Sequence, residues 1–107
     1  MKAHELRNKG VPTTLAGKQY TIHFDMNTFC ELEEIYGDIN LAFEDLAKQR
    51  LKAIRALLYA ALKAQDETLT LTKVGEILSL SDMEGLATSI YEALDRAMPE
   101  KEEQVGE

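Results

Sequence analysis

The segment of residues 50–64 constrains the fold most, because it is apolar around most of a helical circumference. Its apolar residues recur on several sides of a helix, and most of them favour helix formation. They are Leu51, Ala53, Ile54, Ala56, Leu57, Leu58, Ala60, Ala61 and Leu62. A helix of this kind must be covered by other parts of the chain. The sequence therefore predicts a central buried helix over residues 51–64.

Four side chains interrupt this apolar surface. They are Lys52, Arg55, Tyr59 and Lys63. Their spacing of three, four and four residues places them on one narrow stripe of the helix. Such a stripe faces either water or an acidic partner, and arginine and tyrosine are favoured interface anchors. We predict these four as partner-binding residues, with a merely solvated stripe as the alternative.

A β-hairpin is predicted over residues 11–24, before the central helix. Gly17, in the short loop of residues 16–18, can adopt the positive φ that a tight turn requires. Apolar side chains alternate along the second strand, as a half-buried strand requires. They are Tyr20, Ile22 and Phe24. Pro12 cannot donate a backbone hydrogen bond, which favours an edge position or the start of the first strand.

Helical periodicity and capping residues organise the rest of the chain. Besides the central helix, we expect helices at about residues 26–36, 41–49, 71–79 and 82–98. The expected N-caps are Asp25 or Asn27, Asn40, Thr70, and Ser81 in a capping box with Glu84. Gly37 suits a C-cap, and Pro99 stops the last helix. The expected fold class is α+β: an N-terminal β-hairpin followed by four to five α-helices, mostly helical.

These elements fit a single domain of residues 10–98, since a chain this short rarely holds two cores. Residues 1–9 show no periodicity and are expected to form a flexible arm. Residues 99–107 are acidic and almost free of apolar side chains, so a disordered tail is expected there.

Charge and hydropathy narrow the classes of function. A net charge of −7 repels nucleic-acid phosphates and anionic lipids, so we expect a protein partner, no nucleic acid and no membrane. No apolar run approaches the roughly 20 residues that span a bilayer, and no signal-peptide pattern opens the chain, which predicts a cytoplasmic protein. Cys30 lies in a predicted amphipathic helix and is expected to be a buried structural thiol.

The sequence contains no recognisable catalytic or metal-binding motif. His4, His23 and Cys30 fall on different predicted elements, which gives neither a metal site nor a nucleophile beside a base. The carboxylates of residues 31–38 fall largely on a polar helix face, where a solvated surface is the simpler interpretation. The six glycines are scattered rather than clustered in a phosphate loop. We therefore predict no enzyme activity, no catalytic residue, no metal and no cofactor.

Residues 69–96 superficially resemble a helix-turn-helix, which gives a small DNA-associated regulator as one alternative. A recognition helix needs basic or amide side chains for phosphates and base edges. The second helix instead carries Asp82, Glu84, Glu92 and Asp95, with no lysine or arginine before Arg96. Its charge disfavours DNA binding.

Residues 10–27 and 32–37, followed by Phe43, Leu46 and the segments 53–62 and 71–75, resemble the tail assembly chaperones of long-tailed phages and prophages. The resemblance covers about residues 10–95 and lies in the order and spacing of these segments. It implies a protein of tail morphogenesis that is absent from the finished virion. Its expected partners are the tape measure protein, which it keeps soluble, and the major tail tube protein, which it helps to polymerise.

A structural tail component is the other alternative, because some similar sequences are labelled as tail tube or gene-transfer-agent components. Such a subunit would be a homo-oligomer that assembles through its hairpin edges. For the chaperone, we expect the working surface to combine Arg55, Tyr59 and Lys63 with an exposed strand edge.

Overall fold

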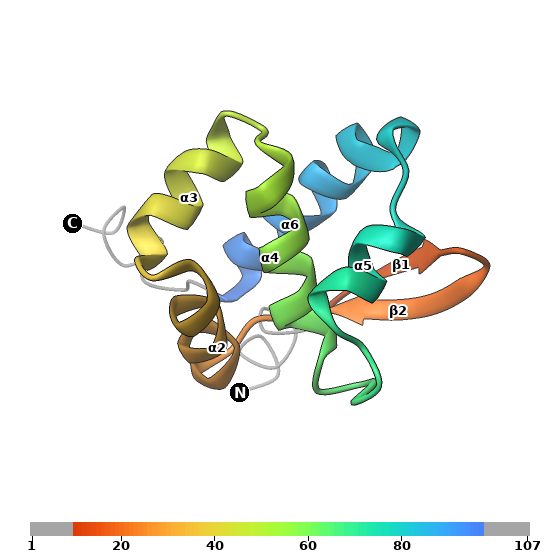
Figure 1. The fold of residues 1–107 in the computed structure, drawn as a ribbon, viewed down its shortest axis with the longest axis horizontal. Coiled ribbons are helices and arrows are strands. Elements are labelled where there is room, and N and C mark those ends of the chain that lie inside the picture. Colours follow the sequence, from red (N-terminus) through yellow and green to blue (C-terminus); the bar gives the residue numbers. More distant parts are fainter. Residues whose placement is uncertain (1–9, 98–107) are drawn as a thin grey trace.

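The computed structural model describes residues 10–97, in which an antiparallel hairpin precedes five α-helices (Figure 1). The elements are β1 (Val11–Leu15), β2 (Lys18–Ile22), α2 (Met26–Tyr36), α3 (Ile39–Ala47), α4 (Leu51–Leu62), α5 (Leu71–Ile77), the 3-10 turn η1 (Leu80–Asp82) and α6 (Met83–Ala97). The predicted α+β class is confirmed. The predicted arm of residues 1–9 and the predicted tail of residues 99–107 lie outside the described residues.

Helix α4 is the centre of the fold, as its apolar circumference predicts. It packs against α2, α3, α5, α6 and β2 (Figure 1). Ile54, Leu57, Leu58 and Leu62 belong to its fully buried side chains. The helix ends at Leu62, two residues before the predicted end, because the chain turns there and Gln65 N–H donates to the Leu62 carbonyl.

The hairpin turns through two residues, Ala16 and Gly17, with φ angles of 51° and 79°. Positive φ at both positions is the requirement of a type I′ turn, whose twist matches that of the paired strands. The register pairs Val11 with Ile22, Pro12 with Thr21, Thr13 with Tyr20, Thr14 with Gln19 and Leu15 with Lys18. The loop is therefore one residue shorter than predicted.

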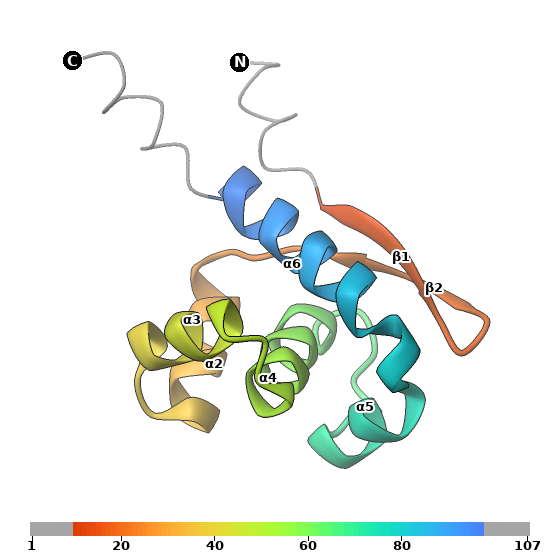
Figure 2. The same cartoon turned by 90° about the horizontal axis from the view of Figure 1, so that it is seen from above.

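One face of the hairpin belongs to the core. Its buried residues are Val11, Leu15, Tyr20 and Ile22. Helix α6 packs against both strands and against α4, while β2 also contacts α4 directly (Figure 2). The opposite face is polar and exposed.

The second strand ends at Ile22, before the predicted limit of residue 24. The chain leaves the sheet because Asp25 already caps α2, and its carboxylate accepts the Thr28 N–H at 3.0 Å. Phe24 is buried nonetheless, and its ring stacks on Phe29 with centroids 5.7 Å apart. The prediction was right about the burial of Phe24 and wrong about the strand.

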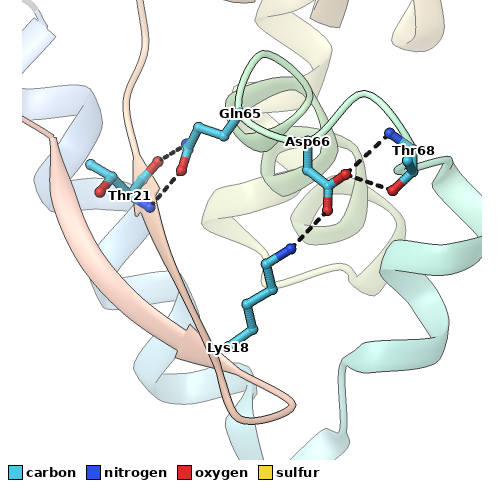
Figure 3. A network of polar contacts seen from close by, with 5 residues as sticks. All are labelled: Lys18, Thr21, Gln65, Asp66 and Thr68. Carbon is cyan, nitrogen blue, oxygen red and sulfur yellow. Dashed lines mark hydrogen bonds and ion pairs between the residues drawn. The ribbon is translucent and has the colours of Figure 1, made fainter.

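The loop after α4 closes the outer edge of β2 (Figure 3). The Gln65 side chain accepts the Thr21 N–H at 3.0 Å and donates its amide N–H to the Thr21 carbonyl. Lys18 lies 3.3 Å from the Asp66 carboxylate, which also accepts the Thr68 N–H at 3.1 Å. At Thr21, the expected free hairpin edge is therefore occupied by the Gln65 side chain.

Local capping chemistry was predicted correctly at three helix ends. Of the two candidates for α2, Asp25 is the N-cap. Gly37 ends that helix with φ 88°, and its N–H donates to the Glu33 carbonyl at 2.7 Å. Thr70 caps α5 by accepting the Lys73 N–H at 3.1 Å.

Helix α3 begins earlier than predicted, at Ile39, with Asp38 as its N-cap. The predicted cap, Asn40, instead donates its backbone N–H to the Asp38 carboxylate at 2.8 Å. The helix also ends at Ala47 rather than residue 49, because Gln49 turns to a left-handed φ of 57°.

The predicted capping box of Ser81 and Glu84 is wrong. Ser81 lies inside η1, and its Oγ is 3.0 Å from the Oγ of Ser79, which also donates to the Asp82 carboxylate at 2.9 Å. The preceding helix α5 stops at Ile77, two residues early, so the 3-10 turn occupies the space before α6.

Cys30 was expected to be buried, and it is exposed. The buried side chains of α2 are Thr28 and Leu32. Cys30 lies two positions from each of them. With 3.6 residues per turn, its side chain therefore points to the opposite, exposed side of the helix.

Candidate functional site

The predicted stripe of α4 lies between two neighbouring helices and is only partly exposed to water. Lys52 is exposed, whereas Arg55, Tyr59 and Lys63 are half-buried. The Lys52 ammonium lies over the Tyr36 ring of α2, 5.5 Å from its centroid. Helix α5 packs along the other side of α4.

The structure divides the stripe between two hollows. Lys52 and Arg55 line a groove toward α5, while Lys63 lines a separate hollow beside α2. Tyr59 lines neither of them; the Lys63 ammonium lies 5.7 Å from the centroid of its ring. The four predicted side chains therefore do not line a single hollow.

The groove has a volume of about 400 Å³. It is lined by Leu51, Lys52, Arg55, Gly75, Leu78, Ser79, Leu80 and Met83. The first three come from α4, and the others come from α5, η1, the residues between them, and the start of α6. We call this the α4–α5 groove.

Two leucines at the α4–α5 groove are unusually exposed. Leu51 retains 54% of its accessible surface and Leu80 retains 76%. The half-buried side chains of Leu78 and Met83 continue the apolar surface. Exposed apolar side chains that meet in a groove are typical of a binding site rather than of a simple solvated face.

The turn η1 accounts for the exposure of Leu80. The Ser79 hydroxyl donates to Asp82 and lies against Ser81, which holds the tight turn closed on both sides of Leu80. The leucine at the first position of that turn points away from the core. Sequence reasoning missed this residue, although a single leucine among serines and an aspartate was the available signal.

Gly75 leaves space beside Arg55. A Cβ at Gly75 would lie 3.5 Å from Arg55 Cδ and 3.9 Å from its Nη1, which is ordinary van der Waals contact. The guanidinium therefore lies along the surface of α5 at the wall of the groove. Within residues 10–97, no hydrogen bond or ion pair joins the Arg55 side chain to another residue.

The hollow beside α2 is more polar, with a volume of about 560 Å³. His23, half-buried just after β2, lines it together with Asp25, Glu31, Lys63 and Glu67. Lys63 is paired 3.0 Å from Glu31, and this hydrogen bond raises the pKa of Lys63. Asp25 caps α2, and the Thr28 N–H lowers the pKa of its carboxyl. Lys63, Glu31 and Asp25 are thus engaged within the fold, so we place the candidate site in the α4–α5 groove.

Among residues 10–97, no group of three or more His, Cys, Asp or Glu side chains is placed to hold a metal ion. None of the described helices is long and apolar enough to cross a membrane. No family model, curated protein or solved structure matches the chain.

Proposed function

We propose that this chain is a phage tail assembly chaperone that binds the tape measure and major tail tube proteins in the bacterial cytoplasm during tail morphogenesis. The observation that carries the proposal is the α4–α5 groove, with Leu51 and Leu80 exposed on a small acidic domain. The resemblance of residues 10–95 to such chaperones supplies the identity of the partners.

The chemistry of the groove suits reversible binding of an apolar segment. Covering the exposed parts of Leu51 and Leu80 would contribute about 2 to 4 kcal/mol. A micromolar complex needs about 8 kcal/mol beyond the costs of association, so the leucines alone would give only a weak, reversible contact. Arg55 at the wall is available to supply part of the remainder. The net charge of −7 keeps copies of the chain apart while the leucines are uncovered.

The hairpin edges disfavour the structural-subunit alternative. Gln65 occupies both backbone groups of Thr21 on the outer edge of β2. Pro12, opposite Thr21 in the register, offers no N–H on the outer edge of β1. Strand-to-strand polymerisation would have to displace the Gln65 side chain at one edge and tolerate the missing N–H of Pro12 at the other.

The charge of α6 disfavours the DNA-regulator alternative. Glu84, Glu92 and Asp95 are exposed along the helix. Its basic residue, Arg96, contacts Glu92 at 2.8 Å and donates to the Gly10 carbonyl at 2.9 Å. Phosphates would meet an acidic helix surface.

Co-expression of the tape measure protein with this chain tests the proposal. We expect the tape measure protein to be soluble with the wild-type chain, and to elute with it in size-exclusion chromatography. Leu80→Ser should reduce recovery, whereas Leu41→Ser, an exposed leucine of α3 outside the groove, should not.

Two results would count against the proposal. Equal recovery of soluble tape measure protein with Leu80→Ser and with wild type would show that the groove does not bind it. Failure to solubilise either partner, together with concentration-dependent self-assembly of the chain alone, would favour the structural tail component.

A further inference from the structure

Arg55 occupies an unusual position for a cation in this acidic protein. Its side chain is half-buried at the wall of the α4–α5 groove, with Cδ facing Gly75. Lys52 beside it lies over the Tyr36 ring, and Lys63 further along α4 is paired with Glu31. Of these three cations, only Arg55 has neither an aromatic ring nor a carboxylate as a partner among residues 10–97. The groove therefore presents a planar donor group that the described fold leaves without an acceptor.

We infer that the α4–α5 groove takes an amphipathic helix whose apolar side chains cover Leu51 and Leu80 and whose carboxylate pairs with Arg55. This inference rests on the proposed function and specifies the kind of segment bound. An arginine guanidinium binds a carboxylate through two parallel hydrogen bonds, which fixes the register of the bound segment as well as its affinity.

The walls of the groove favour a helix over an extended strand. They are formed by α4, α5, η1 and the start of α6, so they offer side chains rather than an open strand edge. A helix recognises such a surface with residues three and four positions apart, which present apolar anchors on one face. Gly75 carries no side chain and leaves room for close approach at the wall.

Electrostatics further define the segment. The whole chain carries a net charge of −7, so a strongly acidic segment is repelled at long range. Arg55 places a positive charge at the groove wall. The segment that fits both conditions is neutral or basic overall and carries one carboxylate next to its apolar anchors. This combination discriminates against other apolar helices, because they leave Arg55 unpaired.

Overlapping peptides of about 25 residues that span the tape measure protein test the inference against the ¹⁵N-labelled full chain. We expect the peptides that bind to carry apolar residues at three- and four-residue spacing beside an aspartate or glutamate. Amide shifts should concentrate at Leu51, Arg55, Gly75 and Leu80. Arg55→Glu should weaken binding at least tenfold. Lys73→Glu, which makes the same charge change at an exposed site of α5 outside the groove, should weaken it by less than threefold.

A charge exchange makes the test specific. Replacing the peptide carboxylate by lysine should weaken binding to the wild-type chain and restore binding to the Arg55→Glu variant. Equal effects of Arg55→Glu and Lys73→Glu, or no restoration, would overturn the paired carboxylate. Peptide binding with shifts confined to other surfaces would overturn the groove while leaving the chaperone function standing. Absence of binding by every peptide and by the intact tape measure protein would overturn both.

Discussion

The side-chain amide of Gln65 bonds to both backbone groups of Thr21, accepting its N–H at 3.0 Å and donating to its carbonyl. In the antiparallel register, Thr21 faces Pro12, which has no N–H, so both backbone groups of Thr21 point outward from the hairpin. Gln65 thus fills the place that a residue of a third strand would take (Figure 3). A two-stranded sheet protected in this way does not offer a continuous template for edge-to-edge association.

Gln65→Ala should uncover the edge of β2. We expect the free energy of unfolding to fall by about 1 kcal/mol, because two solvent-exposed hydrogen bonds are lost. We also expect the apparent mass in light scattering to rise with concentration relative to wild type. Gln19→Ala, an exposed glutamine on the same strand, serves as the control. Unchanged stability and apparent mass in Gln65→Ala would show that the Gln65 side chain does not protect the edge of β2.

Gly75→Ala should stabilise the protein by about 0.5 to 1 kcal/mol in urea unfolding, since glycine is a poor helix former and the new Cβ meets only Arg55 at contact distance. Gly85→Ala in α6, where nothing lies within 4 Å of a new Cβ, should also stabilise. The two variants differ in the groove, which Gly75 lines and Gly85 does not. If the groove binds a helix closely, only Gly75→Ala should weaken recovery of the tape measure protein.

Ala16→Asn should stabilise the hairpin turn. Ala16 adopts φ 51°, a left-handed conformation that is costly for alanine and more accessible to asparagine or glycine. We expect a gain of about 0.5 to 1 kcal/mol in urea unfolding, and a similar gain for Ala16→Gly. Ala47→Gly, at the end of helix α3, serves as the control and should be destabilising. A gain only at Ala16 would show that the positive φ, and not glycine in general, is the cause. A loss of stability in both Ala16 variants would contradict this account of the turn.

The parts of the fold that were predictable depend on short stretches of sequence. The apolar circumference of α4 identifies a buried helix without any knowledge of its neighbours. Asp25, Gly37 and Thr70 act through hydrogen bonds within four residues, so their positions can be read locally. Where two local solutions compete, the sequence is insufficient. Asp38 and Asn40 both suit a helix start, and the earlier cap allows Ile39 to pack against the core.

The groove depends on contacts between distant segments, and for this reason spacing along α4 could not define it. Arg55 and Leu80 line the same hollow although they are 25 residues apart in the chain. The stripe interpretation identified Lys52 and Arg55 from one helix, but the position of α5 and the turn at Leu80 decide what they face. The same limit applies to Lys63, whose partner Glu31 lies on another helix.

The hydrogen bond from Tyr36 to Asp45 predicts a specific pH dependence. The phenol hydroxyl donates to the carboxylate at 2.7 Å. Burial, then this hydrogen bond and the charge of Asp45, raise the pKa of Tyr36 to about 12, above its usual value of 10.0. Because the folded state holds this proton more tightly, the stabilisation is complete below pH 10 and is lost as the pH rises from 10 to about 12.

Tyr36→Phe should therefore lower the free energy of unfolding by about 1 to 2 kcal/mol near neutral pH, through loss of a hydrogen bond to a charged acceptor. The difference from wild type should stay constant up to about pH 9 and shrink between pH 10 and about 12, as measured by urea unfolding at each pH. Absorbance at 295 nm should show a late-titrating component in the folded wild type that is missing in Tyr36→Phe. Tyr91→Phe, which removes an exposed tyrosine of α6, should retain it. A stability difference that is the same at pH 8 and pH 11.5 would show that Asp45 does not hold the Tyr36 proton.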